Sequence, residues 1–98
     1  MTDAPLAPHQ LRRLALRPLL GLARTGSYAQ EGSGEIGLAL STSLTASLDN
    51  SALNPYFAAA YEAAQEAVYN CLVAGRPAER LDGTMQEAFP VDLVRRAV

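Results

Sequence analysis

The sequence predicts an α+β fold in the order helix, strand, long helix, short extended segment and short terminal helix. Three observations support this. Two stretches repeat apolar residues at helical spacing, one run alternates large apolar with small residues, and glycine or proline marks most boundaries. A chain of 98 residues, 49% hydrophobic and 18% charged, forms at most one domain. Because one strand cannot form a sheet alone, residues 1–98 are expected to be a single partial domain.

The first helix is predicted from Pro8 to Arg24. Its apolar positions share one face and are Leu11, Leu14, Ala15, Pro18 and Leu22. Proline inside a helix removes a hydrogen bond and clashes with the preceding turn, so we expect a kink near Arg17 or two abutting helices. Glycine favours a helix end at Thr25-Gly26. We interpret the arginines of this segment as a solvated face.

A strand is predicted from Glu35 to Thr42, after a loop over residues 27–34 and before a second loop over residues 43–51. One face of the strand carries large apolar side chains, namely Ile36, Leu38 and Leu40. The other face carries small ones, namely Gly37, Ala39 and Ser41. Small residues indicate that another element packs very close to that face.

The long helix is predicted from Asn54 to Ala74, with Asn54 as its N-cap and Gly75 as its stop. Its apolar stripe, which we expect to cover the large face of the strand, is Phe57, Ala60, Tyr61, Ala64, Val68, Cys71 and Leu72. Beyond it we predict a turn at Asp82-Gly83, extended chain over residues 84–88, and a terminal helix over residues 91–97.

Composition argues against several functions. All eight basic residues are arginine and the net charge is −2, so nucleic acid is an unexpected partner. No apolar run reaches the length of a membrane span, and the N-terminus lacks a signal-peptide pattern, so we expect no membrane contact and a cytoplasmic location. One cysteine, Cys71, and one histidine, His9, cannot form a Cys/His zinc cluster. No metal or cofactor is expected.

Several ordered motifs resemble one family. They are Thr2-Asp3-Ala4-Pro5-Leu6, Pro8-His9-Gln10-Leu11, the run from Gly21 to Ser27, Gly32-Ser33-Gly34-Glu35-Ile36, and Leu40-Ser41-Thr42. Together they closely resemble the L-aminopeptidase/D-esterase family of self-processing D-aminopeptidases and β-peptidyl aminopeptidases. The later half matches more loosely. The match corresponds to the C-terminal part of the small subunit.

This resemblance implies part of a four-layer α-β-β-α sandwich and an N-terminal-nucleophile serine aminopeptidase that cuts its own precursor. It implies a large subunit of the same precursor as partner, or a homo-oligomer, and a small peptide, amide or ester as substrate. In the family the nucleophilic serine lies one short strand upstream of the motif that begins here at Thr2. The chain therefore resembles a small subunit without its nucleophile and is expected to be inactive alone.

The resemblance also implies two catalytic residues, Ser33 and Glu35. In a strand, residues i and i+2 point to the same side, so both side chains can face one pocket. A serine nucleophile needs a partner that removes its proton, and these two side chains are suited to relay or orient that proton.

Other interpretations stay open. His9 fits a surface or capping residue, Cys71 a small core residue, and the four tyrosines (Tyr28, Tyr56, Tyr61 and Tyr69) packing positions. Two alternative functions remain for the chain: a non-catalytic module that pairs with another subunit, and a hydrolase of polyamide oligomers.

Overall fold

The computed structural model describes residues 1–32 and 34–97. Within them it contains helices and a small antiparallel sheet of two strands, so the fold is of the α+β class. The contacts divide the chain into two compact units, Met1–Glu66 and Ala67–Val98.

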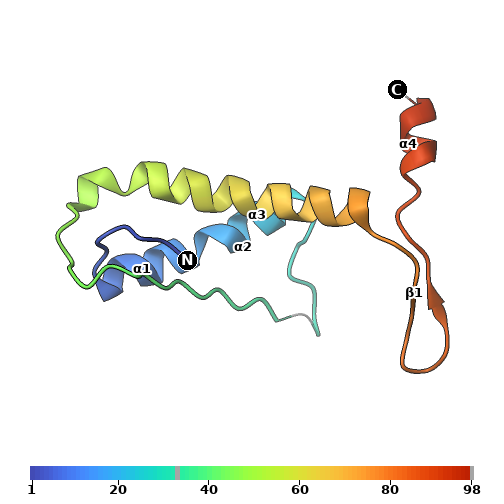
Figure 1. Cartoon of the computed structure of the whole chain (residues 1–98), viewed down its shortest axis with the longest axis horizontal. Helices are drawn as coiled ribbons and strands as arrows, with labels where there is room; N and C mark the ends of the chain where they lie inside the picture. The colour runs from blue at the N-terminus through green and yellow to red at the C-terminus, as the bar shows by residue number, and fades with distance from the viewer. Residues whose placement is uncertain (33, 98) are drawn as a thin grey trace. The chain divides into compact units, whose positions relative to one another are not determined.

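The first unit begins with two abutting helices, as the internal proline predicts. Helix α1 spans Pro8–Ala15 and helix α2 spans Arg17–Arg24, with Leu16 between them and Pro18 in the first turn of α2. A proline at that point has no helical hydrogen bond to lose. Helix α2 ends at Arg24 with Thr25 as its C-cap, and Gly26 follows with a φ of +106°. Figure 1 places α1 and α2 end to end beside the first part of α3.

Helix α3 spans Asn54–Ala74 and follows a single 3-10 turn, η1, at Asn50–Ala52. The first carbonyl that α3 uses belongs to Leu53, which accepts the Phe57 N–H at 3.0 Å. Asn54 therefore lies inside the helix, one residue beyond the cap position predicted for it. The end at Ala74 agrees with the prediction.

A carboxylate caps the η1 turn. The backbone N–H of Ser51 donates to Asp49 Oδ1 at 2.8 Å. This bond and a side-chain hydrogen bond from Ser51 lower the pKa of the Asp49 carboxyl, because both stabilise its charged form.

Helix α2 approaches α3 closely because glycine and alanine meet at the contact. Gly21 is buried, and a Cβ there would overlap the Tyr61 carbonyl oxygen and lie 3.1 Å from the Ala64 Cβ. Arg13 and Arg17 lie over the ring of Phe57 at 5.2 and 4.2 Å, and Arg24 lies 5.6 Å from the centroid of the Tyr61 ring. Arg12, Arg13 and Arg24 are exposed, as the predicted solvated face requires, and Arg17 is half-buried. The contacts with the rings are an addition that the sequence did not predict.

The core is small and centred on the N-terminal segment. Its buried apolar residues are Ala4, Leu6, Leu14 and Leu53. One polar side chain, Gln10, is buried with them. Its Nε2 donates to the Leu48 carbonyl at 2.9 Å and to Asn50 Oδ1 at 3.0 Å, and its Oε1 accepts the Ala7 N–H at 2.9 Å. All the polar groups of this amide have partners, which is what burial requires.

The segment predicted as a strand, 35–42, follows the expected alternation of faces. Its small face lies against the helices: a Cβ on Gly37 would overlap the carbonyl oxygen of Ala15 and lie 3.0 Å from its carbonyl carbon. The predicted close packing on this face is confirmed.

Two other expectations for this segment were wrong. The large side chains Ile36, Leu38 and Leu40 are 93%, 77% and 54% exposed, so the stripe on α3 does not cover them. The segment was also predicted to be a β-strand. Among the described residues, however, its regular pairing is limited to one parallel bridge, between Thr2 and Ser41. The reason is steric, since only the face without large side chains can approach a helix backbone this closely.

The second unit contains the last turns of α3, a hairpin and a helix. Strands β1, Ala78–Glu79, and β2, Met85–Gln86, pair antiparallel around a turn at Asp82-Gly83. The turn and the terminal helix α4, Val91–Ala97, were predicted, whereas β1 was not. Cys71 is exposed, so its assignment to the core was wrong.

Candidate functional site

The two predicted catalytic positions lie where the loop after α2 meets the extended segment. Ser33 is outside the described residues. Glu35 is described and half-buried, and every second residue after it is half-buried as well. Because side chains at i and i+2 share a side in extended chain, Glu35 lies on the same face as Gly37, the face that packs on the helices.

Glu35 lines a pocket of about 420 Å³ beside α2. Its other lining residues come from one face of that helix and from the loop that follows it, and are Leu19, Leu22, Ala23, Ser27, Tyr28 and Ala29. The resemblance did not predict the three helix residues as part of a site. Their i, i+3, i+4 spacing marked a shared face, but nothing in the sequence indicated that this face meets Glu35.

The loop beside Glu35 has a defined backbone. Ala29 has a φ of +51°, and Gly32 has a φ of +81°. A positive φ is uncommon for a residue with a side chain, and it is retained where the surroundings impose it, often at functional sites. The Tyr28 hydroxyl donates to Gln30 Oε1 at 2.9 Å, across the Ala29 turn.

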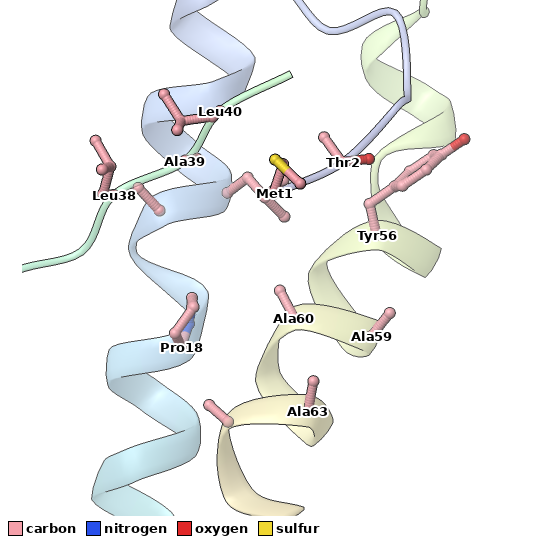
Figure 2. Close-up of a pocket in the computed structure, with 13 residues that line it drawn as sticks. Met1, Thr2, Pro18, Leu38, Ala39, Leu40, Tyr56, Ala59, Ala60 and Ala63 are labelled. Carbon is pink, nitrogen blue, oxygen red and sulfur yellow. The ribbon is translucent and has the colours of Figure 1, made fainter. Parts of the chain in front are cut away.

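A second hollow, of about 450 Å³, lies between the extended segment and the helices. We call it the alanine groove, because α3 lines it with Ala59, Ala60, Ala63 and Ala64. Figure 2 shows the side chain of Met1 between residues 38–40 on one side and the methyl groups of α3 on the other. Pro18 and Leu14 complete its apolar lining.

The extended segment also has unused backbone groups. Thr2 N–H donates to the Leu40 carbonyl, and Thr42 N–H donates to the Thr2 carbonyl, both at 2.9 Å. Within the described residues, the backbone of 36–39 makes no hydrogen bond to another backbone segment. An edge of this kind is able to accept a further strand.

The remaining candidates lie apart from Glu35. His9 is exposed on α1, and Tyr56 packs against the core through a half-buried ring. Across residues 1–32 and 34–97, no three His, Cys, Asp or Glu side chains are grouped to hold a metal ion. No helix in this described part is long and apolar enough to cross a bilayer.

Comparisons with known proteins agree with this arrangement. The model of peptidase family S58 matches residues 1–86. Two β-peptidyl aminopeptidases named BapA are similar, one from Sphingosinicella xenopeptidilytica (37% identity, 97% of this chain) and one from Sphingosinicella microcystinivorans (36% identity, 91% of this chain). The chain spans 27% and 26% of their lengths, about a quarter.

A solved structure is similar as well. The crystal structure of the PH0078 protein from Pyrococcus horikoshii OT3 superposes with a TM-score of 0.87 at 38% sequence identity. The match covers 96% of this chain and 30% of that one.

Proposed function

The chain belongs to peptidase family S58, the L-aminopeptidase/D-esterase family, and we propose that it is the C-terminal part of the small subunit of a serine aminopeptidase. In the intact enzyme Glu35 and Ser33 assist a nucleophilic serine that is not among these 98 residues. The enzyme cuts its own precursor, has the four-layer α-β-β-α architecture and is cytoplasmic. The observation that carries the proposal is the half-buried Glu35 on the wall of a pocket, in a chain of this family.

The parallel bridge supports the position of the nucleophile. Thr2 is opposite Ser41, and Glu35 lies six positions before Ser41. Parallel strands advance together. If the strand continues upstream of Met1 in the same register, the residue six positions before Thr2 therefore lies opposite Glu35. The resemblance places the serine one short strand upstream of Thr2, which agrees with this register.

The alanine groove supports the same strand. Met1 lines the open groove and is 95% exposed (Figure 2), and the backbone of 36–39 offers an edge. A strand at this edge fills the groove with its alternate side chains, and small residues on α3 leave room for them.

The chemistry is acyl transfer. The serine hydroxyl attacks the carbonyl carbon of the substrate and loses its proton, and the leaving amine takes a proton as the C–N bond breaks. Water then attacks the acyl-enzyme and releases the acid. Glu35 accepts and returns the proton, directly or through Ser33. The substrate is a peptide, amide or ester with a free amino terminus.

The test compares two carboxylates of the same loop in an enzyme that includes the upstream sequence. Glu35→Gln is expected to lower kcat about 10²–10⁴-fold, as loss of an acid–base partner does. Glu31 is exposed, so Glu31→Gln is the matched control and is expected to keep full activity. Both variants should unfold at the same denaturant concentration. A near-normal kcat for Glu35→Gln at neutral pH would refute the role of this carboxylate.

The 98-residue chain alone is expected to be inactive toward aminoacyl p-nitroanilides, since it lacks the group that forms the acyl intermediate. Turnover by the purified chain that a serine-directed reagent abolishes would contradict this.

A second candidate function is a non-catalytic module that pairs with another subunit, and the exposed face of Ile36, Leu38 and Leu40 favours it. Both proposals require this face to be covered, by the large subunit or by a second copy. We therefore expect the chain alone to self-associate, and Leu38→Ser to weaken the association in sedimentation at several concentrations. Leu81→Ser is the control, because Leu81 is fully exposed in the hairpin. Activity of the upstream-extended enzyme decides between the two functions.

A further inference from the structure

The pocket beside Glu35 is lined by apolar residues of helix α2 and by Glu35 itself. Leu19, Leu22 and Ala23 line it from helix α2, and Tyr28 lines it from the loop. The polar groups that line it are limited, among the described residues, to Ser27, Tyr28 and Glu35. A volume of about 420 Å³ lies within the range of about 300–1,000 Å³ typical of small-molecule sites, which are mostly apolar with a few polar groups that fix orientation.

The loop wall is held in place by local bonds. Thr25 Oγ1 donates to the Leu22 carbonyl at 2.7 Å, and the Gly26 N–H donates to the Ala23 carbonyl at 3.1 Å. Two residues further on, the hydroxyl of Tyr28 is held by Gln30. These contacts set the exit of the chain from α2 and so position the loop residues that line the pocket.

Because Glu35 is the proposed acid–base residue, a group bound in this pocket lies next to the scissile bond. We propose that the pocket binds an apolar side chain of the substrate residue that contributes the attacked carbonyl, with Leu22, Ala23 and Tyr28 as specificity-determining residues. This inference rests on the proposed function and adds the substrate class: amides of amino acids with aliphatic or aromatic side chains.

The pocket predicts a side-chain preference. In the intact enzyme, kcat/KM for leucine p-nitroanilide should exceed that for alanine p-nitroanilide by at least about tenfold, since a single methylene in an apolar pocket changes the rate by 10-fold or more. The leaving group is the same in both substrates, so the ratio reports on the acyl side alone.

Filling the pocket should remove this preference. Ala23 lines the pocket and is exposed, so Ala23→Phe places a ring in it without disturbing the core. We expect the ratio of kcat/KM for the leucine substrate to that for the alanine substrate to fall at least tenfold. Ala58 is an exposed alanine of α3 that lines neither hollow, and Ala58→Phe should leave the ratio unchanged. An unchanged ratio in Ala23→Phe, or an equal loss for both substrates, would overturn the proposal.

A binding measurement separates this inference from the proposed function. We expect leucinamide, but not glycinamide, to shift the backbone amide NMR signals of Ala23 and Tyr28 in the 98-residue chain. If the intact enzyme has no activity and leucinamide still shifts these signals, the proposed function fails and the pocket assignment stands. If leucinamide shifts neither signal, the pocket assignment fails whatever the activity.

Discussion

Replacing Gly37 by alanine is the most direct test of how the extended segment is held. The added methyl group would overlap the Ala15 carbonyl oxygen and lie 3.0 Å from the carbonyl carbon, where carbon atoms prefer about 3.5–4.0 Å. The obstacle is the backbone of the last residue of α1, which cannot turn aside as a side chain would. The segment itself must therefore move away from the helix.

The size of the effect follows from two opposing contributions. Overpacking of this kind costs about 1–3 kcal/mol, whereas replacing glycine stabilises by about 0.4–1 kcal/mol through the unfolded chain. We expect a net loss of about 1–2 kcal/mol in the free energy of unfolding. With a urea dependence of about 1–3 kcal/mol per molar, the midpoint should fall by roughly 1 M.

The assay is urea unfolding followed by circular dichroism at one fixed protein concentration, because association changes apparent stability. Gly34 supplies the matched control. It lies three residues earlier, nothing is within 4 Å of its would-be Cβ, and its φ is not positive. Gly34→Ala should be neutral or slightly stabilising. Equal midpoints for the two variants would refute the close packing of Gly37 on α1.

Three further predictions concern other contacts. Gln10→Glu replaces the buried amide donor by a carboxylate oxygen that faces two oxygen acceptors, so thermal unfolding should show a loss of about 3 kcal/mol, as for an uncompensated buried charge; an unchanged Tm would contradict the hydrogen bonds assigned to this amide. Arg17→Ala should cost about 0.5–1 kcal/mol in chemical denaturation through its contact with Phe57, and Arg12→Ala, at an exposed position, should cost less. Folding lowers the pKa of the Asp49 carboxyl, so this group contributes fully to the free energy of unfolding above its ordinary pKa of 3.8, and the contribution declines as the pH falls through the lowered folded pKa. The stability difference between wild type and Asp49→Ala should therefore shrink in acid unfolding below pH 3.8. A constant difference would contradict the cap.

The helices were predictable from sequence because proline and glycine mark their boundaries. Pro18 separates α1 from α2, Gly26 ends α2, and Gly75 follows the end of α3. The strand β1 was not predictable, since Ala78 and Glu79 have neither alternation nor β-branched side chains. The exposure of Cys71 was also unpredictable, because helical periodicity identifies a shared face without saying which element covers it.

The candidate site was predictable in part. The family resemblance identified Glu35, and alternation placed it on one face with Gly37. The apolar wall formed by Leu19 and Leu22 needed the structure, because it depends on where the chain passes in space. The small residues correctly predicted close packing on the face of Gly37, whereas hydrophobicity alone wrongly predicted that the stripe of α3 covers the face of Ile36.

The contacts of the N-terminal segment impose an order on events during synthesis. Ser41 Oγ donates to the Ala4 carbonyl across 37 residues, and Gln10 reaches Asn50 across 40. Residues 4 and 10 leave the ribosome before residues 41 and 50, so neither bond can form until the chain has been synthesised that far, and the core is complete only with Leu53, its most buried residue. Closing a loop of this length carries an entropic cost that only the completed core repays. The first unit therefore completes its core only after residue 53 has been synthesised, and until then the buried face of residues 4–14 stays open to chaperones.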